Sequence, residues 1–161
     1  MRIPRRRHTM GGLLPRAISR EGIELEQHVR EGRFQQQLAV AAGLAALLSG
    51  LEALYSHYKN NFTYRKLQWS PILLTPLMMA AGIGTVSSRA AARTVLPVAS
   101  VLCLLDGSIG SFFHLRGVWR RPGGLKLPLY NTIYGPPVFA PLLFAASGFM
   151  GVLASLLRRS R

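Results

Sequence analysis

Two histidines occupy matching positions in two similar apolar segments of the chain. Residues 47–58 read LLSGLEALYSHY and residues 104–115 read LLDGSIGSFFHL, so six residues separate a glycine from His57 in one segment and from His114 in the other. Neutral imidazole is a good ligand for haem iron and for Zn, Cu or Fe. Two imidazoles meeting at one depth of a membrane could occupy both axial positions of a haem b. The spacing therefore marks His57 and His114 as candidate cofactor-binding residues.

A plainer interpretation of the two histidines is open and is the one that the sequence favours. Histidine is amphipathic and is common where a helix leaves the membrane, and loop carbonyls there can satisfy both imidazoles. A pair of histidines alone specifies no metal, and the single Cys103 and the absence of any CxxC pattern add no further ligand set. The identity of a bound metal or cofactor is therefore not predicted by the sequence.

Two acidic residues, Glu52 and Asp106, interrupt the same apolar segments. A charge inside the membrane is costly, so each carboxylate needs a partner or a function. On a helix, Glu52 points ~140° away from His57, and Asp106 points ~80° away from His114, so any partner must come from another helix. An interhelical bond, such as one between Glu52 and Arg116, is the favoured interpretation. A proton or ion relay through Asp106 is the alternative.

A second pair of matched segments follows the first pair in the same order. Pro76 opens the run PLMMAAG, and Pro141 opens the run PLLFAAS. The repeated order predicts a duplicated helical hairpin, an arrangement that often places a site between the two halves of a membrane protein. We expect both prolines to bend their helices, which could open a cavity or could only shape the packing.

Four long apolar blocks define the fold class. They cover roughly residues 36–57, 70–88, 94–115 and 134–157, and each approaches the ~20 residues that a helix needs to cross ~30 Å of hydrocarbon. A water-soluble bundle would need polar stripes on its outward faces, and these blocks have none. The sequence therefore predicts an all-α polytopic membrane protein that folds as an antiparallel four-helix transmembrane bundle.

The charge distribution predicts the orientation in the membrane and the partners. The net charge is +14, and thirteen basic residues lie before the first block, in the second loop and in the tail, against seven in the other two loops. The positive-inside rule then places both termini in the cytoplasm of a bacterial inner membrane, and no cleavable signal peptide is expected. Anionic lipid headgroups, rather than nucleic acid, are the expected partners of this charge. Arg120 and Arg121 are candidate headgroup ligands.

The chain divides into three parts by composition. Residues 1–35 form a basic cytoplasmic segment with a possible surface helix from about Ile18 to Gln37, residues 36–157 form the transmembrane domain, and residues 158–161 form a basic cytoplasmic tail. The transmembrane part resembles a group of uncharacterised small bacterial four-span membrane proteins. The resemblance rests on the segments EALYSHY (residues 52–58), FHLRG (residues 113–117), LPLYN (residues 127–131) and GPPVFAPLLF (residues 135–144). It implies topology and transfers no catalytic residue.

These observations favour a protein without catalysis of its own. The sequence contains no GxSxG, HExxH or phosphate-binding motif. We therefore predict a non-catalytic accessory or anchoring subunit of a larger membrane complex, with other membrane-protein subunits as partners. A redox subunit that carries haem b between His57 and His114 is the alternative. A small transporter that uses Pro76, Pro141 and Asp106 is a further one.

Overall fold

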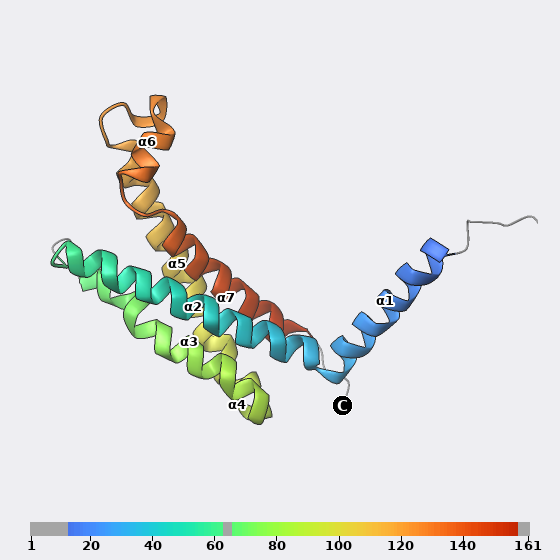
Figure 1. Ribbon diagram of the computed structural model, residues 1–161. Helices are drawn as coiled ribbons and strands as arrows, with labels where there is room; N and C mark the ends of the chain where they lie inside the picture. Colours follow the sequence, from blue (N-terminus) through green and yellow to red (C-terminus); the bar gives the residue numbers. More distant parts are fainter. Residues whose placement is uncertain (1–12, 63–65, 158–161) are drawn as a thin grey trace, which may run out of the picture.

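The computed structural model describes residues 13–62 and 66–157, with side chains from residue 22 onward. The predictions for the basic start at residues 1–12 and for the tail at residues 158–161 lie outside this part of the chain. Within it, all regular structure is helical (Figure 1). The elements are α1 (Leu13–Glu31), α2 (Arg33–Lys59), η2 (Lys66–Trp69), α3 (Ser70–Ser87), α4 (Arg89–Arg93), α5 (Val95–Trp119), η3 (Gly124–Lys126), α6 (Pro128–Ile133) and α7 (Phe139–Leu156).

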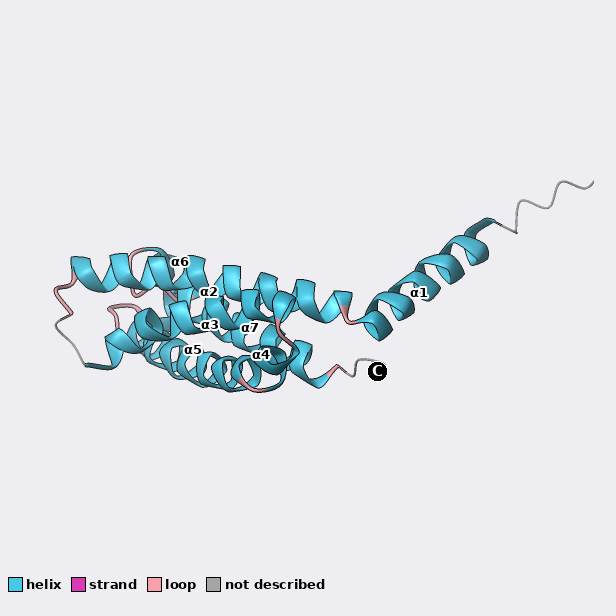
Figure 2. Ribbon diagram, turned by 90° about the horizontal axis from the view of Figure 1, so that it is seen from below, coloured by secondary structure: helices cyan, strands magenta, loops and turns pink. Residues whose placement is uncertain are grey.

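Four helices are long and apolar enough to cross a membrane. They are α2 with 27 residues, η2 and α3 together with 22, α5 with 25 and α7 with 18. The four helices run side by side and alternate in direction along the chain (Figure 2). The predicted fold class, an all-α polytopic bundle, is therefore confirmed, and the protein is a multi-pass membrane protein.

The distribution of side-chain sizes is the reverse of that in a water-soluble bundle. Small residues fill the centre, among them Ala39, Ala42, Ala46, Ala99 and Cys103. Apart from the buried Met78, Leu96 and Phe144, many large apolar side chains point outward instead. Their exposed fractions reach 65% for Leu48, 68% for Leu73 and 74% for Phe139. In water this outer surface would be unfavourable, whereas in lipid it costs nothing. The packing therefore fits a bundle that is surrounded by hydrocarbon.

Each spanning helix packs against two others. α2 lies against α3 and α7, and α5 lies against α7 and α3. Glycines allow this packing to bring backbones into contact: a Cβ atom on Gly107 would lie 2.3 Å from the backbone nitrogen of Ala145, and one on Gly50 would lie 1.9 Å from Oγ1 of Thr75. Both glycines contact the second helix of their own hairpin. Such close approach is the main source of helix association in lipid.

The helix ends differ from the sequence-based expectation in two places. The surface helix was expected to continue to Gln37, but α1 ends at Glu31. Gly32 adopts a left-handed conformation with a φ of 80°, and α2 begins one residue later. The bend expected at Pro141 is wrong, because α7 begins at Phe139 and Pro141 therefore lies in the first turn, where no backbone hydrogen bond is lost. Pro76, in contrast, lies inside α3 as expected.

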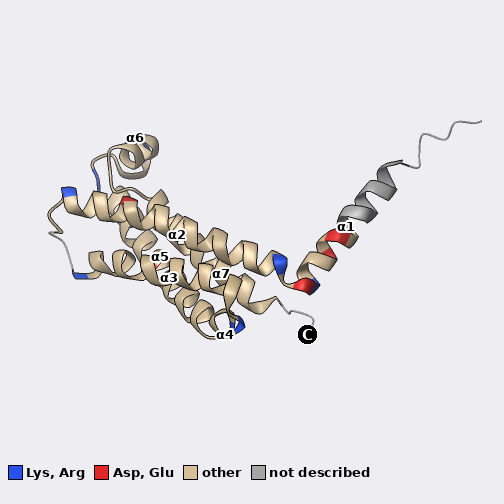
Figure 3. Cartoon of the chain, turned by 60° about the horizontal axis from the view of Figure 1, so that its bottom comes forward, with Lys and Arg blue, Asp and Glu red and all other residues tan. Residues whose placement is uncertain are grey.

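The two ends of the bundle carry the basic residues. Among the described residues, Lys and Arg lie near the helix ends, and the middle of the bundle is free of them (Figure 3). Arg33, Arg89 and Arg93 lie at the end where α2 starts and where α3 and α4 finish. Helix α1 leaves this end and projects away from the bundle (Figure 1). Its junction is held by Gln35, whose Nε2 donates to the Val29 carbonyl at 2.7 Å.

The opposite end is covered by the long connection between α5 and α7. Arg121 donates to the carbonyl of Tyr134 at 2.6 Å, and the amide nitrogen of Asn131 donates to the carbonyls of Pro122 and Gly124 at 3.2 and 3.0 Å. Asn131 is buried although it lies in a connecting segment. The connection therefore forms a hydrogen-bonded cap that contains α6.

We expect Gly107→Ala to destabilise the bundle by about 1 to 3 kcal/mol, because the added methyl group would meet the backbone of α7, which cannot move aside. Gly84→Ala is the matched control, since its methyl group would lie 3.4 Å from the nearest atom, the Cβ of Ala91. That variant should be neutral or stabilised by up to ~1 kcal/mol. The temperature at which the fully buried Cys103 becomes open to alkylation in detergent measures both effects. Equal temperatures for the two variants would contradict the close contact.

Candidate site at the end of the bundle near His57 and His114

A cavity of about 320 Å³ lies at the end of the bundle where α2 and α5 finish and where α3 and α7 begin. Its inner limit is formed by Gly107 and Phe144, and its outer part is bordered by His57, His114 and Pro137. The volume lies within the usual range for small-molecule sites, roughly 300 to 1,000 Å³. The remaining lining residues are Ser49, Ala53, Ser56, Leu67, Gln68, Ser70, Pro71, Asp106, Ile109, Gly110, Phe113, Ala140 and Pro141.

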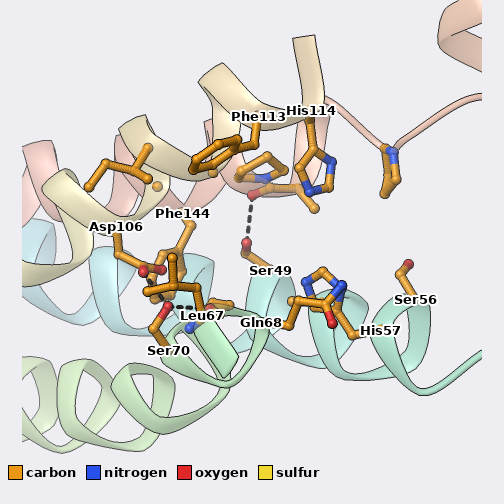
Figure 4. A pocket seen from close by; sticks show the side chains of 18 residues that line it. Ser49, Ser56, His57, Leu67, Gln68, Ser70, Asp106, Phe113, His114 and Phe144 are labelled. Carbon is orange, nitrogen blue, oxygen red and sulfur yellow. Dashed lines mark hydrogen bonds between the residues drawn. The ribbon is translucent and has the colours of Figure 1, made fainter. Parts of the chain in front are cut away.

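The structure brings the two candidate histidines together. His57 lies in the last turn of α2, and His114 lies five residues before the end of α5. Their ring centroids are 6.3 Å apart, and the ring planes meet at 76°. Figure 4 shows the two rings projecting into the cavity from opposite walls. Matched residues of the two similar segments therefore meet across the cavity.

The turn after α2 positions η2, which forms part of the cavity wall. The carbonyl of His57 accepts hydrogen bonds from the backbone N–H groups of Asn60 and Phe62 at 3.1 and 3.0 Å. The Phe62 ring then stacks on Trp69, with centroids 4.3 Å apart and planes at 10°. This stacking ties the turn to η2, which carries Leu67 and Gln68 into the cavity.

Asp106 is hydrogen-bonded to the first residue of α3. The Ser70 hydroxyl lies between a carboxylate oxygen of Asp106 and the carbonyl of Leu67, which is 2.7 Å away (Figure 4). Helix α3 has no side-chain cap of its own at Trp69, and a carboxylate near the positive end of its dipole is favourable. Asp106 therefore links α5 to the start of α3. This is the interhelical bond that the sequence favoured over a proton or ion relay.

Ser49, which matches Asp106 in the first segment, also bonds to the opposite hairpin. Its hydroxyl donates to the Ala140 carbonyl of α7 at 2.6 Å (Figure 4). Ser49 thus joins α2 to α7, and Asp106 joins α5 to α3. The two segments use the same position for the same kind of contact, although the side chains differ.

The other candidate residues lie outside the cavity. Glu52 is exposed on α2, and the expected ion pair with Arg116 is not formed: the ion pairs among the described residues join Arg30 to Glu26 and Arg33 to Glu31. Of the two candidate headgroup ligands, Arg121 is occupied by the Tyr134 carbonyl, whereas Arg120 is exposed at the end of α5. A role for either arginine in lipid binding stays a prediction.

Two buried acceptor atoms on the cavity wall lack a donor. Nδ1 of the His114 ring is buried without a partner. Oε1 of Gln68 is also buried without a partner. A buried polar atom left unpaired costs about 1 to 3 kcal/mol, so such atoms mark a place where a water or a ligand completes the structure.

The imidazole spacing suits a metal centre in one respect only. Two imidazoles that bind one metal ion from opposite sides, each through a metal–nitrogen bond of about 2 Å, would place their ring centroids roughly 6 Å apart. The observed distance between the centroids is 6.3 Å. No group of three His, Cys, Asp or Glu residues that could hold a metal ion occurs in the part of the chain that the structure describes. The described lining of the cavity also includes no Lys or Arg that could pair with the propionates of a haem.

Sequence reasoning missed the contributions of η2 and of the aromatic residues. Gln68, Phe113 and Phe144 line the cavity, but none of them stands out by spacing or by motif. The only available signal for Gln68 was its position just before the start of the second span. Of the serines between each glycine and its histidine, Ser56 lines the cavity, whereas Ser108 and Ser111 bond to carbonyls of their own helix at 2.7 Å.

Comparison of the chain with protein-family models, with curated proteins and with solved structures finds no match. The resemblance to small four-span membrane proteins therefore stays a prediction. The functional argument rests on the geometry of this chain alone.

We expect Asp106 and Ser70 to be coupled in stability by about 1 to 2 kcal/mol, because their hydrogen bond joins α5 to the start of α3. A double-mutant cycle of Asp106→Ala and Ser70→Ala, followed by thermal alkylation of Cys103, measures this coupling. Ser108→Ala is the matched control, since its hydroxyl donates to Leu104 within α5. Equal coupling of Asp106 to both serines would exclude a specific role for the bond.

Proposed function

We propose that this chain is a non-catalytic integral membrane subunit that anchors or supports a larger membrane complex. The observation that carries the proposal is Glu52, an exposed carboxylate on a membrane-spanning helix that forms no ion pair within the described residues. It lies seven residues before the end of α2, about 10 Å along the helix axis. A carboxylate at this depth needs a partner, and a basic or hydrogen-bonding residue of another membrane protein would supply one.

The surroundings of Glu52 support a protein partner. Leu48, one turn earlier, and Tyr55, one turn later, are exposed by 65% and 63%, so the carboxylate lies beside an open apolar surface. Helix α1 adds a second surface outside the bundle, with Ile23 and Leu25 exposed by 55% and 53%. Nearly all of the rest of the described chain belongs to the bundle and its cap.

We also propose a bacterial inner-membrane location with both termini in the cytoplasm. The basic residues at the α1 end of the bundle support this orientation under the positive-inside rule. In this orientation the cavity faces the outer leaflet. The matched contacts of Ser49 and Asp106, together with the meeting of His57 and His114, support a bundle built from a duplicated hairpin.

Photo-crosslinking in native membranes tests the proposed partner. We expect a crosslinking amino acid at Leu48 to capture a second membrane protein, and one at Ile83 on α3 to capture lipid. Glu52→Gln should lower the yield from Leu48 by roughly tenfold, because the partner's polar group would lose its charged counterpart in the membrane. Glu52→Asp is the matched control and should retain most of the yield. The proposal fails if Leu48 captures only lipid or a second copy of this chain, or if Glu52→Gln has no effect.

A redox subunit with haem b is the second candidate, and the spacing of His57 and His114 favours it. When bound, haem would supply one-electron transfer, and the two imidazoles would hold the iron. We expect protein expressed with ample haem to show a Soret band that is lost in His57→Ala and in His114→Ala, whereas His28→Ala on α1 should keep it. Purified protein without a Soret band would remove this candidate.

A further inference from the structure

The unpaired atoms of the cavity define what a ligand must offer. When the His114 ring carries its proton on Nε2, the unpartnered Nδ1 has a lone pair and accepts a hydrogen bond. Oε1 of Gln68 is a carbonyl oxygen and also accepts. In Figure 4, His114 lies on one wall, and Gln68 lies with His57 on the facing wall. A ligand that satisfies both walls therefore carries two hydrogen-bond donors.

The rest of the lining defines the charge and the shape of the ligand. Among the described residues, no Lys or Arg lines the cavity, and its carboxylate, Asp106, is already bonded to Ser70. A phosphate or another anionic headgroup would therefore find no counter-ion. Leu67, Phe113 and Phe144 contribute apolar and aromatic wall. The lining suits a neutral, flat and largely apolar group.

We propose that this cavity binds the aromatic head of a membrane quinol, with its apolar tail in the surrounding lipid. A quinol is neutral, carries two O–H donors on one flat ring and reaches its sites from within the membrane. The donors match Gln68 Oε1 and His114 Nδ1, and the ring matches the aromatic walls. The cavity volume of about 320 Å³ suits one ring and the first carbons of its tail. This inference does not depend on the proposed protein partner.

Water and haem satisfy these requirements less completely. A water molecule has two donors, but it leaves the apolar wall around Phe113 and Phe144 without a contact. Haem iron would use the lone pair of His114 but would leave the Gln68 carbonyl unpaired, and its propionates would find no cation in the lining. The quinol is the occupant that uses both acceptors and the apolar wall together.

Binding to the full chain in lipid nanodiscs tests the proposal. A quinol with a decyl tail, kept reduced under argon, should bind saturably above the level of empty nanodiscs. Its dimethyl ether and the corresponding quinone keep the ring and the tail but lose both O–H donors. We expect both to bind at least about tenfold weaker, the loss that one or two hydrogen bonds explain. Decanol, which lacks the ring, should show no saturable binding.

Two variants connect the binding to the unpaired acceptors. Gln68→Leu and His114→Leu should each weaken quinol binding by about tenfold. Gln68→Leu should not lower the temperature of Cys103 alkylation, because it removes a buried acceptor that has no donor in the free protein. Gln37→Leu on α2 and His28→Leu on α1 are the matched controls and should leave binding unchanged. If His114→Leu fails to fold, Gln68→Leu carries the same test from a different element.

Several outcomes overturn the quinol site. Absence of saturable binding would leave a cavity that holds only water. Equal affinity for the quinol, its ether and the quinone would show that the O–H donors play no part, and equal affinity for decanol would assign the site to aliphatic alcohols. A Soret band that depends on His57 and His114 would assign the cavity to haem. Unchanged quinol affinity in Gln68→Leu would place the ligand elsewhere.

Discussion

Contact between helix backbones is the constraint on which the rest of this bundle depends. In lipid, burial of large apolar side chains gives no net driving force, so association relies on close packing. Gly50 and Gly107 bring α2 onto α3 and α5 onto α7, and small residues such as Ala42 and Ala99 fill the centre. The contact at Gly107 also forms the inner limit of the cavity. The cavity therefore occupies the part of the bundle beyond this contact, where the helices no longer touch.

The polar residues of the spans divide into three roles. Ser49 and Asp106 join the two hairpins through hydrogen bonds, and these bonds fix how the helices pair. His114 and Gln68 keep acceptors unpaired on the cavity wall, which costs stability and is explained by a ligand. Glu52 is exposed on α2 and forms no ion pair within the described residues. In our proposals, stability, ligand binding and partner binding therefore depend on different side chains.

The two halves of the bundle correspond closely in position and less closely in chemistry. His57 and His114 match and meet, whereas Ser49 matches Asp106 and Glu52 matches Ile109. The difference has a physical use, because Asp106 can support the start of α3, which lacks a cap of its own. α7 instead begins with Pro141 in its first turn and receives the Ser49 hydroxyl at the Ala140 carbonyl. Ser49 and Asp106 therefore differ in chemistry because the helix starts that they contact, those of α7 and α3, also differ.

The sequence by itself determined the four spans, their alternating directions and the shared depth of the two histidines, because length, hydropathy and spacing are local properties of a chain in a membrane. It also indicated an interhelical bond for Asp106. Only the tertiary structure decided which partner each polar residue meets: Asp106 meets Ser70, Glu52 does not meet Arg116, and Gln68 enters the cavity through the stacking of Phe62 on Trp69. These contacts depend on helix rotation and on turn geometry, which periodicity in one helix cannot specify.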